Sequence, residues 1–222
     1  MPHIARTWPP TDLHHLTTRG NAGGLVFLGV ADRELFLDLF DEVVETRTWD
    51  LYAWSMLGNH FHIVVRAEPD SLSKGMQRLK GVYAMRFHRR HHTSGHLFKR
   101  PYHSRPILTP EHLHRGCGYT LRNPVRHGLV DRAEEWEWSS FRAVAGLAPP
   151  PRPHLGCEPF VQLLGLRETT ERLAVMRAYV HDAPPVSSDS PDENPARSAQ
   201  GRRATVTRAA KRLDPEGAMI GV

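Results

Sequence analysis

Residues 49–67, WDLYAWSMLGNHFHIVVRA, contain two runs that are typical of β-strands. The runs 49–57 and 60–67 are rich in aromatic and β-branched residues, which favour extended strands. Gly58-Asn59 lies between the two runs, and such a pair is typical of a tight turn. We therefore predict two adjacent antiparallel strands, and the rest of the chain is interpreted around this hairpin.

A helical pattern flanks the hairpin on each side. Asp32 is expected to cap a helix that runs to about Arg47, and Asp70 or Ser71 to cap a second helix that runs to about Arg90. The apolar residues recur at the helical period, which predicts one buried face on each helix. These residues are Leu35, Phe36, Leu39, Phe40, Val43 and Val44 in the first helix, and Leu72, Met76, Leu79, Tyr83 and Phe87 in the second.

The remaining elements complete a β, α, β, β, α, β, α order. Leu13–Arg19 and His96–Ile107 are predicted strands, and Thr109-Pro110 begins a third helix because proline suits the first helical position. That helix is expected to end near Asn123, because the residue before a proline avoids the helical region. The order predicts the α+β class, with a ferredoxin-like antiparallel sheet that carries its helices on one face.

Composition divides the chain into three parts. Residues 1–148 are expected to form the main domain, with Trp136, Trp138 and Phe141 pinning its last segment to the core. A proline-rich stretch at 149–153 marks a boundary, and residues 149–183 are predicted to form a small helical extension. Residues 184–222 are dominated by Ser, Pro, Asp, Asn and Arg, which predicts a disordered basic tail.

The composition also excludes several classes of protein. The chain has 222 residues, of which 40% are hydrophobic and 24% charged, as in soluble globular proteins. It has no apolar run long enough to span a membrane and no secretory signal at its N-terminus, so we expect a cytoplasmic protein. Cys117 and Cys157 are too few for a disulfide framework or a four-cysteine zinc site.

Charge is distributed unevenly along the chain. Residues 31–70 carry a net charge of −6, whereas residues 71–130 carry +11, with Glu111 as their one acid. Such asymmetry favours a polyanionic partner, and nucleic acid in particular, over an ordinary solvated surface. The bases expected to contact it are Arg78, Lys80, Arg86, Arg89, Arg90, Lys99, Arg100, Arg105 and Arg122.

His60 and His62 lie two residues apart in a predicted strand, so their side chains point to the same face. Two imidazoles in that position can bind one divalent cation. The spacing alone is a weak signal, because a chain with 15 histidines contains such pairs by chance. The alternative is two polar residues on the open face of a sheet. His112 and His114 have the same spacing on a predicted helix, where their side chains diverge and are not expected to chelate.

Tyr119 and Asn123 are separated by one helical turn and therefore share a helical face. An amide oxygen is an acceptable ligand for a hard cation. The alternative is a half-buried tyrosine followed by an asparagine that caps the helix. A tyrosine is a weak nucleophile because its pKa is near 10, but a metal that polarises a phosphodiester makes it useful. Two histidines, an amide and a tyrosine together are the parts that such a reaction needs.

Several segments together resemble the REP-associated branch of the single-tyrosine HUH transposases, named for a His-hydrophobic-His motif. Residues 56–65, MLGNHFHIVV, resemble the HUH motif, and residues 119–125, YTLRNPV, resemble the segment that carries the nucleophile. The other similar segments are 18–21 (TRGN), 73–79 (SKGMQRL), 95–98 (GHLF) and 136–140 (WEWSS). The matches follow the family order over about residues 11–145.

The resemblance implies a domain that nicks single-stranded DNA at short palindromic hairpins, the REP elements of bacterial genomes. It implies that His60 and His62 hold Mg²⁺ or Mn²⁺, that Asn123 completes the metal site, and that Tyr119 is the nucleophile. Attack by the tyrosine would leave a 5′-phosphotyrosine link and a free 3′-OH that can later rejoin strands. The expected location is the nucleoid region of the bacterial cytoplasm, and both a monomer and a homodimer remain open.

Two other functions remain open. A hairpin-binding protein derived from a transposase, without cleavage, would need neither metal nor Tyr119, and a metallohydrolase would use a metal-bound water. Tyr83 and Tyr102 are alternative nucleophiles, although Tyr83 lies on a predicted apolar stripe. Gly58 replaces the proline that is usual in the family, which changes the turn and leaves the metal ligands in place.

Overall fold

The computed structural model describes residues 11–99, 101–166 and 169–181. Its central feature is a four-stranded sheet of order β2-β3-β1-β4, in which all neighbours are antiparallel. The strands are β1 (Leu13–Arg19), β2 (Asp50–Met56), β3 (His60–Arg66) and β4 (His103–Pro106). Together with the helices between them, they confirm the predicted α+β class and ferredoxin-like order.

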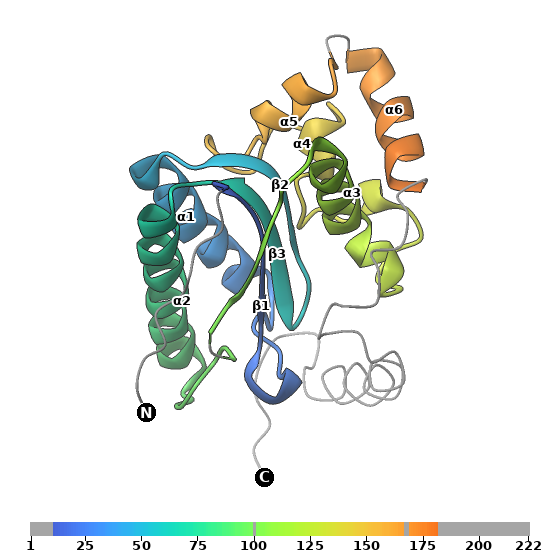
Figure 1. The fold of residues 1–222 in the computed structure, drawn as a ribbon. Coiled ribbons are helices and arrows are strands. Elements are labelled where there is room, and N and C mark those ends of the chain that lie inside the picture. Colours follow the sequence, from blue (N-terminus) through green and yellow to red (C-terminus); the bar gives the residue numbers. More distant parts are fainter. Residues whose placement is uncertain (1–10, 100, 167–168, 182–222) are drawn as a thin grey trace. The chain divides into compact units, whose positions relative to one another are not determined.

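Helices cover both faces of this sheet, so the prediction that the helices lie on one face is wrong (Figure 1). The predicted pair, α1 (Val30–Arg47) and α2 (Pro69–His91), packs together on one face, while α3 (Pro110–Arg126) lies on the other. The two faces follow from the alternation of side chains along β3. Phe61 points to the first face, where its ring lies 4.7 Å from that of Phe36. His60 and His62 therefore point to the face that α3 covers.

The core between the sheet and α1 and α2 is aromatic. The predicted apolar faces of both helices are buried, apart from Leu35, which is half-buried. Gly75 allows α2 to approach the sheet closely, because a Cβ at this position would lie 2.3 Å from Trp49 Cζ2. Trp49 Nε1 donates to Ser71 Oγ in the same contact. The predicted packing stripe of α2 is therefore confirmed.

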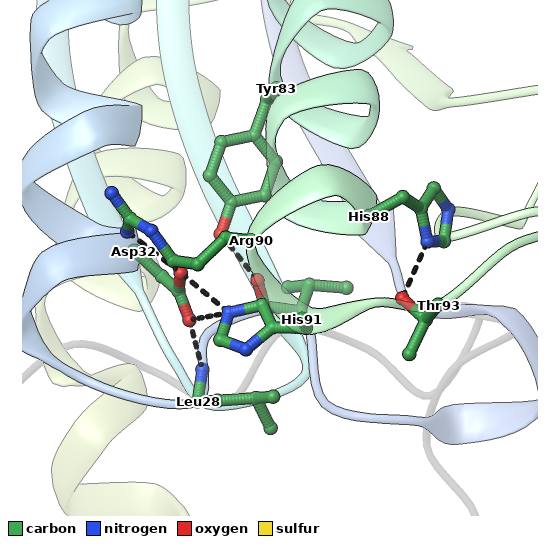
Figure 2. Close-up of polar contacts among 8 residues, drawn as sticks. Leu28, Asp32, Tyr83, His88, Arg90, His91 and Thr93 are labelled. Atoms are coloured by element: carbon green, nitrogen blue, oxygen red, sulfur yellow. Dashed lines mark hydrogen bonds and ion pairs between the residues drawn. The ribbon is translucent and has the colours of Figure 1, made fainter.

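The helix caps differ from the prediction in two places. Gly29, not Asp32, precedes the first residue of α1, and Glu68 precedes Pro69 at the start of α2. Asp32 lies within the first turn of α1 and is 2% exposed. Its carboxylate accepts hydrogen bonds from the Leu28 N–H at 2.9 Å and from Arg90 at 3.1 Å, and it also pairs with His91 (Figure 2). The aspartate thus joins the start of α1 to the end of α2. At α2, the proline rather than Asp70 or Ser71 determines the start, because its fixed φ suits the first helical position.

The predicted strand His96–Ile107 is much shorter in the structure. Only His103–Pro106 pairs with β1, and Phe98 forms an isolated bridge with Gly20. Pro101 lies between these two pairings and has no N–H to donate to a neighbouring strand, which explains why a continuous strand does not form.

The third helix continues beyond its predicted end. Thr109 caps it as predicted, with its hydroxyl accepting the His112 N–H at 3.1 Å. The helix then passes through Pro124 and ends at Arg126. Pro124 is buried, and its carbonyl accepts the Leu129 N–H at 3.0 Å, so contacts after the proline support the last turn.

The chain after α3 packs against the sheet and α3. It contains α4 (Phe141–Val144), α5 (Glu158–Leu163) and α6 (Thr169–His181), and short 3-10 turns occur at Asn21–Gly23 and Ala133–Glu135. Phe141 is fully buried and Trp136 Nε1 donates to Met56 O, as expected of residues that pin this segment. The boundary near residue 149 stays a prediction, and the predicted disordered tail lies outside the described residues. No helix in the described part of the chain is long and apolar enough to cross a membrane.

Candidate active site

His60 and His62 lie side by side under α3. Both are on β3 and are buried, with exposed fractions of 3% and 5%, and their ring centroids are 5.0 Å apart. The Gly58-Asn59 turn precedes His60, and its Gly58 carbonyl accepts the N–H groups of Val26 and Phe27. The start of the strand is therefore held by the loop between β1 and α1. The predicted placement of the two histidines in one strand is confirmed.

Tyr119 reaches the same place from α3. Its ring centroid lies 5.6 Å from that of His62 and 5.8 Å from that of His15, both in edge-on contacts. The tyrosine is 9% exposed, so its ring is enclosed between the helix and the sheet. The candidate nucleophile and the HUH histidines thus come together within a single chain.

Asn123 lies one turn after Tyr119 on α3 and is fully buried. Within the described residues, neither its amide oxygen nor its amide nitrogen has a hydrogen-bond partner. It does not cap the helix, because α3 continues past it. A buried amide without partners is costly, and a metal ion or a substrate group would satisfy it. Its chemistry therefore fits the third ligand of a hard cation beside two histidines.

Burial keeps the histidines of the site neutral. Desolvation, reinforced by His127 and Arg19, lowers the pKa of His60 to about 3. Desolvation, reinforced by the neighbouring histidines, holds the pKa of His62 well below its usual value. Desolvation, with His103 and Arg105, lowers the pKa of His15 to about 4. Neutral imidazoles are the form that binds metal ions.

The two candidate ligands each have a polar neighbour at Nδ1. His60 Nδ1 lies 2.7 Å from Asn59 Oδ1. His62 Nδ1 lies 3.1 Å from Thr17 Oγ1 and 3.2 Å from His15 Nε2, both on the adjacent strand β1. Metal-binding histidines usually have such a neighbour on the nitrogen that does not bind the metal. The sequence-based prediction missed His15 and Thr17 because their contact depends on the pairing of β1 with β3.

His127 and Arg126 are further residues that the sequence-based prediction missed. The His127 ring centroid lies 5.2 Å from that of His60, and the Arg126 guanidinium lies 4.7 Å from the centre of the Tyr119 ring. His127 follows Asn123 by four residues, so the i, i+4, i+8 spacing could have identified it. Within the described ranges no three or more His, Cys, Asp or Glu residues form a metal-binding group. The candidate ligand set is still the one that the resemblance implies, His60, His62 and the Asn123 amide.

The predicted DNA-contact residues of α2 lie on the helix that covers the opposite face of the sheet. Several make contacts within the protein: Arg78 pairs with Glu42, Arg90 pairs with Asp32, and Lys80 lies over the rings of Phe98 and Tyr102. Arg86 and Arg89 are exposed. The structure therefore does not bring the predicted bases of α2 to the candidate active site.

The other predicted bases are spread over several elements. Arg105 on β4 pairs across the sheet with His15, which places it on the active-site face. Arg122 donates to the His181 carbonyl at 3.3 Å. Lys99 is exposed just before β4, and Arg100 lies outside the described residues. Of the predicted bases, Arg105 is the one that the sheet places beside the site histidines.

Tyr83 and Tyr102 lie away from this site. Tyr83 is buried in the core on the opposite face, where its hydroxyl donates to Val26 O, and burial raises its pKa far above the usual value. Tyr102 packs near Lys80 and the α2 side of the core. Tyr119 is therefore the tyrosine whose ring contacts the candidate metal ligand His62.

Comparisons with known proteins bear on the family resemblance and the fold. Residues 15–111 match the family model "Transposase IS200 like". The fold resembles that of a REP-associated tyrosine transposase solved in complex with a REP hairpin, with a TM-score of 0.54 and 19% identity over 67% of this chain and 89% of that chain. A candidate transposase from Deinococcus radiodurans R1 is 18% identical over 48% of this chain and 87% of its own, with a TM-score of 0.37. No curated protein matches the sequence. The resemblance stated from the sequence is confirmed: residues 15–111 are similar to the IS200-like transposase family, and the fold is similar to that of a REP-associated tyrosine transposase.

Proposed function

We propose that this protein is a metal-dependent, single-tyrosine DNA endonuclease and strand transferase. The observation that carries the proposal is the enclosed ring of Tyr119 against His62. One turn further along the same helix, the buried amide of Asn123 has no hydrogen-bond partner among the described residues. A protein that only bound DNA would have no physical need to bury an unsatisfied amide on the helix whose Tyr119 contacts a neutral imidazole. The arrangement supports phosphodiester chemistry better than binding alone.

The reaction is a transesterification. The Tyr119 hydroxyl attacks the scissile phosphorus, so a tyrosine O–P bond forms and the P–O3′ bond breaks. The phenolic proton leaves the tyrosine, and the departing 3′ oxygen takes up a proton to become a 3′-OH. The 5′ side of the break remains bound to the protein as a phosphotyrosine. Attack by a 3′-OH on this link reverses the step and joins strands, without any oxidant or external energy source.

His60, His62 and Asn123 would hold Mg²⁺ or Mn²⁺ in this reaction. When bound, the cation would stabilise the negative charge that develops on the phosphate oxygens. The protein contributes a site in which both imidazoles are neutral and the ring of Tyr119 is confined between α3 and the sheet. Confinement of the nucleophile lowers the entropy cost of reaching the attack geometry.

The proposed substrate is single-stranded DNA that folds into a hairpin. The structural relative was solved with a REP hairpin bound, and residues 71–130 of this chain carry the strong positive charge that a DNA partner requires. Arg105 on the active-site face and Arg126 over Tyr119 are the bases placed to contact the strand near the break. Action on DNA would place the protein with the nucleoid of a bacterial cytoplasm.

The decisive experiment is formation of a covalent protein–DNA adduct. Labelled hairpin DNA is incubated with the protein and Mn²⁺ and analysed on a denaturing gel. The unmodified protein should give an adduct, and Tyr119→Phe should bind the hairpin within a few-fold yet give none. Tyr102→Phe is the matched control and should retain the adduct. An adduct with Tyr119→Phe would reassign the nucleophile, and cleavage without any adduct would favour a metal-bound water.

The metal ligands are tested in the same assay. His60→Ala and His62→Ala should abolish cleavage, whereas Asn123→Ala should recover part of its activity at high Mn²⁺ concentration because two ligands remain. No metal concentration should rescue Tyr119→Phe. Hairpin binding without cleavage in the unmodified protein at every metal concentration would support the alternative of a non-cleaving DNA-binding protein.

A further inference from the structure

We infer that His15 and Thr17 are positioning residues that hold the His62 imidazole in the tautomer whose Nε2 can bind the metal ion. The inference rests on the proposed function, because it concerns the same metal site. Both residues lie on β1, and Thr17 is the direct cross-strand partner of His62. Residues two apart on a strand share a face, so His15 also points toward His62.

A neutral imidazole carries one proton, on either Nδ1 or Nε2. A metal can bind His62 through Nε2 only if the proton is on Nδ1. The two polar atoms next to that nitrogen are Thr17 Oγ1 at 3.1 Å and His15 Nε2 at 3.2 Å. Both can accept a hydrogen bond, so together they can hold the proton at Nδ1.

The His15 ring is placed to act as this acceptor. Its Nε2 also lies 3.4 Å from the hydroxyl of Thr120, which is fully buried on α3. Its ring stacks on that of His62, with centroids 5.3 Å apart, and also contacts the ring of Tyr119. One side chain therefore touches both the candidate metal ligand and the helix that carries the nucleophile.

The neighbouring ligand is held by an analogous contact. Asn59 Nδ2 donates to the Gly23 carbonyl at 3.3 Å, which turns Asn59 Oδ1 toward His60. The oxygen lies 2.7 Å from His60 Nδ1 and can only accept, so this nitrogen carries the proton and Nε2 does not. Different neighbours thus hold His60 and His62 in the same tautomer. This is the arrangement expected of a pre-organised metal site.

The first test measures the tautomer in the metal-free protein. Long-range ¹H–¹⁵N correlation spectra distinguish a protonated ring nitrogen from an unprotonated one. We expect His62 to be protonated at Nδ1 and unprotonated at Nε2. A protonated Nε2 on His62 would overturn the inference, even if the protein cleaves DNA. This measurement needs no variant and does not depend on activity.

The second test measures Mn²⁺ binding by calorimetry without DNA. The double variant His15→Leu/Thr17→Val removes both acceptors at similar volume and should weaken Mn²⁺ binding by about 10- to 100-fold. Each single change should have a smaller effect, because the other acceptor remains. His15→Gln should stay within a few-fold of the unmodified protein, since its side-chain oxygen can replace Nε2. His112→Leu is the matched control on α3 and should leave the affinity unchanged.

The outcomes distinguish a failure of the proposed metal-dependent function from a failure of the positioning role of His15 and Thr17. If the unmodified protein binds no Mn²⁺, the proposed metal-dependent function fails. If it binds Mn²⁺ and the folded double variant binds it equally well, the positioning role is wrong while the proposed function stands. Circular dichroism and hairpin binding in EDTA report whether the double variant is folded, and both should match the unmodified protein.

Discussion

Acid should destabilise this protein well above the pH at which carboxylates titrate. His15, His60 and His62 are neutral in the folded state, whereas an unfolded histidine has a pKa of about 6.5. Between pH 6.5 and the lower folded-state pKa, the unfolded chain binds protons that the folded chain does not. The free energy of unfolding therefore falls as the pH falls, and the full contribution is present only above about pH 6.5.

The size of the effect follows from the folded-state values. The pKa of His60 is lowered to about 3 and that of His15 to about 4, so at pH 5 both are still neutral in the folded protein. At pH 5, each of these two histidines therefore lowers the free energy of unfolding by about 2 kcal/mol relative to pH 7. His62 lowers it further, because its pKa is shifted in the same direction. A total of about 4 kcal/mol or more is a large part of the stability of a typical domain.

Urea unfolding in EDTA at pH 7, 6 and 5 measures this loss. The EDTA keeps metal ions from stabilising the folded state. His15→Gln should reduce the loss between pH 7 and 5 by about 2 kcal/mol, while His96→Gln, at an exposed position, should leave it unchanged. A free energy of unfolding that stays constant between pH 7 and 5 would refute the conclusion that these imidazoles are buried and neutral.

Three further changes test the packing and the DNA-binding face. Asp32→Asn should lower the free energy of unfolding in urea by about 2–4 kcal/mol, because it weakens the buried hydrogen bonds shown in Figure 2; an unchanged midpoint would contradict this. Gly75→Ala should destabilise by about 1–3 kcal/mol in the same assay, since its Cβ overlaps Trp49, although helix propensity alone favours alanine. Arg105→Ala should weaken hairpin binding and reduce its salt slope by about 0.7–0.9 in fluorescence anisotropy, with a smaller effect for Arg86→Ala. A larger effect for Arg86→Ala than for Arg105→Ala would place the DNA on the α2 face.

The order of strands and helices was predictable because its signals are local. The aromatic and β-branched residues of 60–67 and the helical spacing of the α2 stripe are signals of a few neighbouring residues, and the strand and the buried stripe are both present in the structure. Thr109 is likewise a cap that can be identified within four residues. Such features need no knowledge of the rest of the fold.

The errors occur where distant contacts override a local rule. Proline disfavours the helical region for the residue before it, yet α3 continues through Pro124 because the proline is buried and the following chain bonds back to it. Asp32 is a residue type that often caps helices, but its carboxylate is buried and bonded to Arg90 and His91 at the end of α2. Neither contact can be inferred from the adjacent residues.

In the candidate site, too, residues in sequence motifs were predictable, whereas residues brought in by distant contacts were not. His60, His62, Tyr119 and Asn123 were identified from motifs, and the structure brings the histidines and the tyrosine together. His15 was missed because the register of β1 against β3 places it beside His62, and register is a property of the assembled sheet.

The contacts between α3 and β3 depend on the position of α3 along its own axis. His62 contacts Tyr119 and His60 contacts His127. Asn123 is four residues from both Tyr119 and His127, so helical spacing puts it on the same face of α3. A slip of α3 by one turn, about 5.4 Å, would destroy both pairings and shift Asn123 by the same distance.

Contacts from α6 oppose such a slip at two points of α3. Tyr179 donates from its hydroxyl to the His114 carbonyl in the first half of α3, and Arg122 in the second half donates to the His181 carbonyl. Tyr179 also packs on Phe160 of α5, with ring centroids 5.5 Å apart. The sheet thus positions the two histidines, while the chain beyond residue 149 restrains the helix that presents the tyrosine and the amide to them. The chain beyond residue 149 and the candidate active site are therefore linked through direct contacts to α3, although they lie far apart in the sequence.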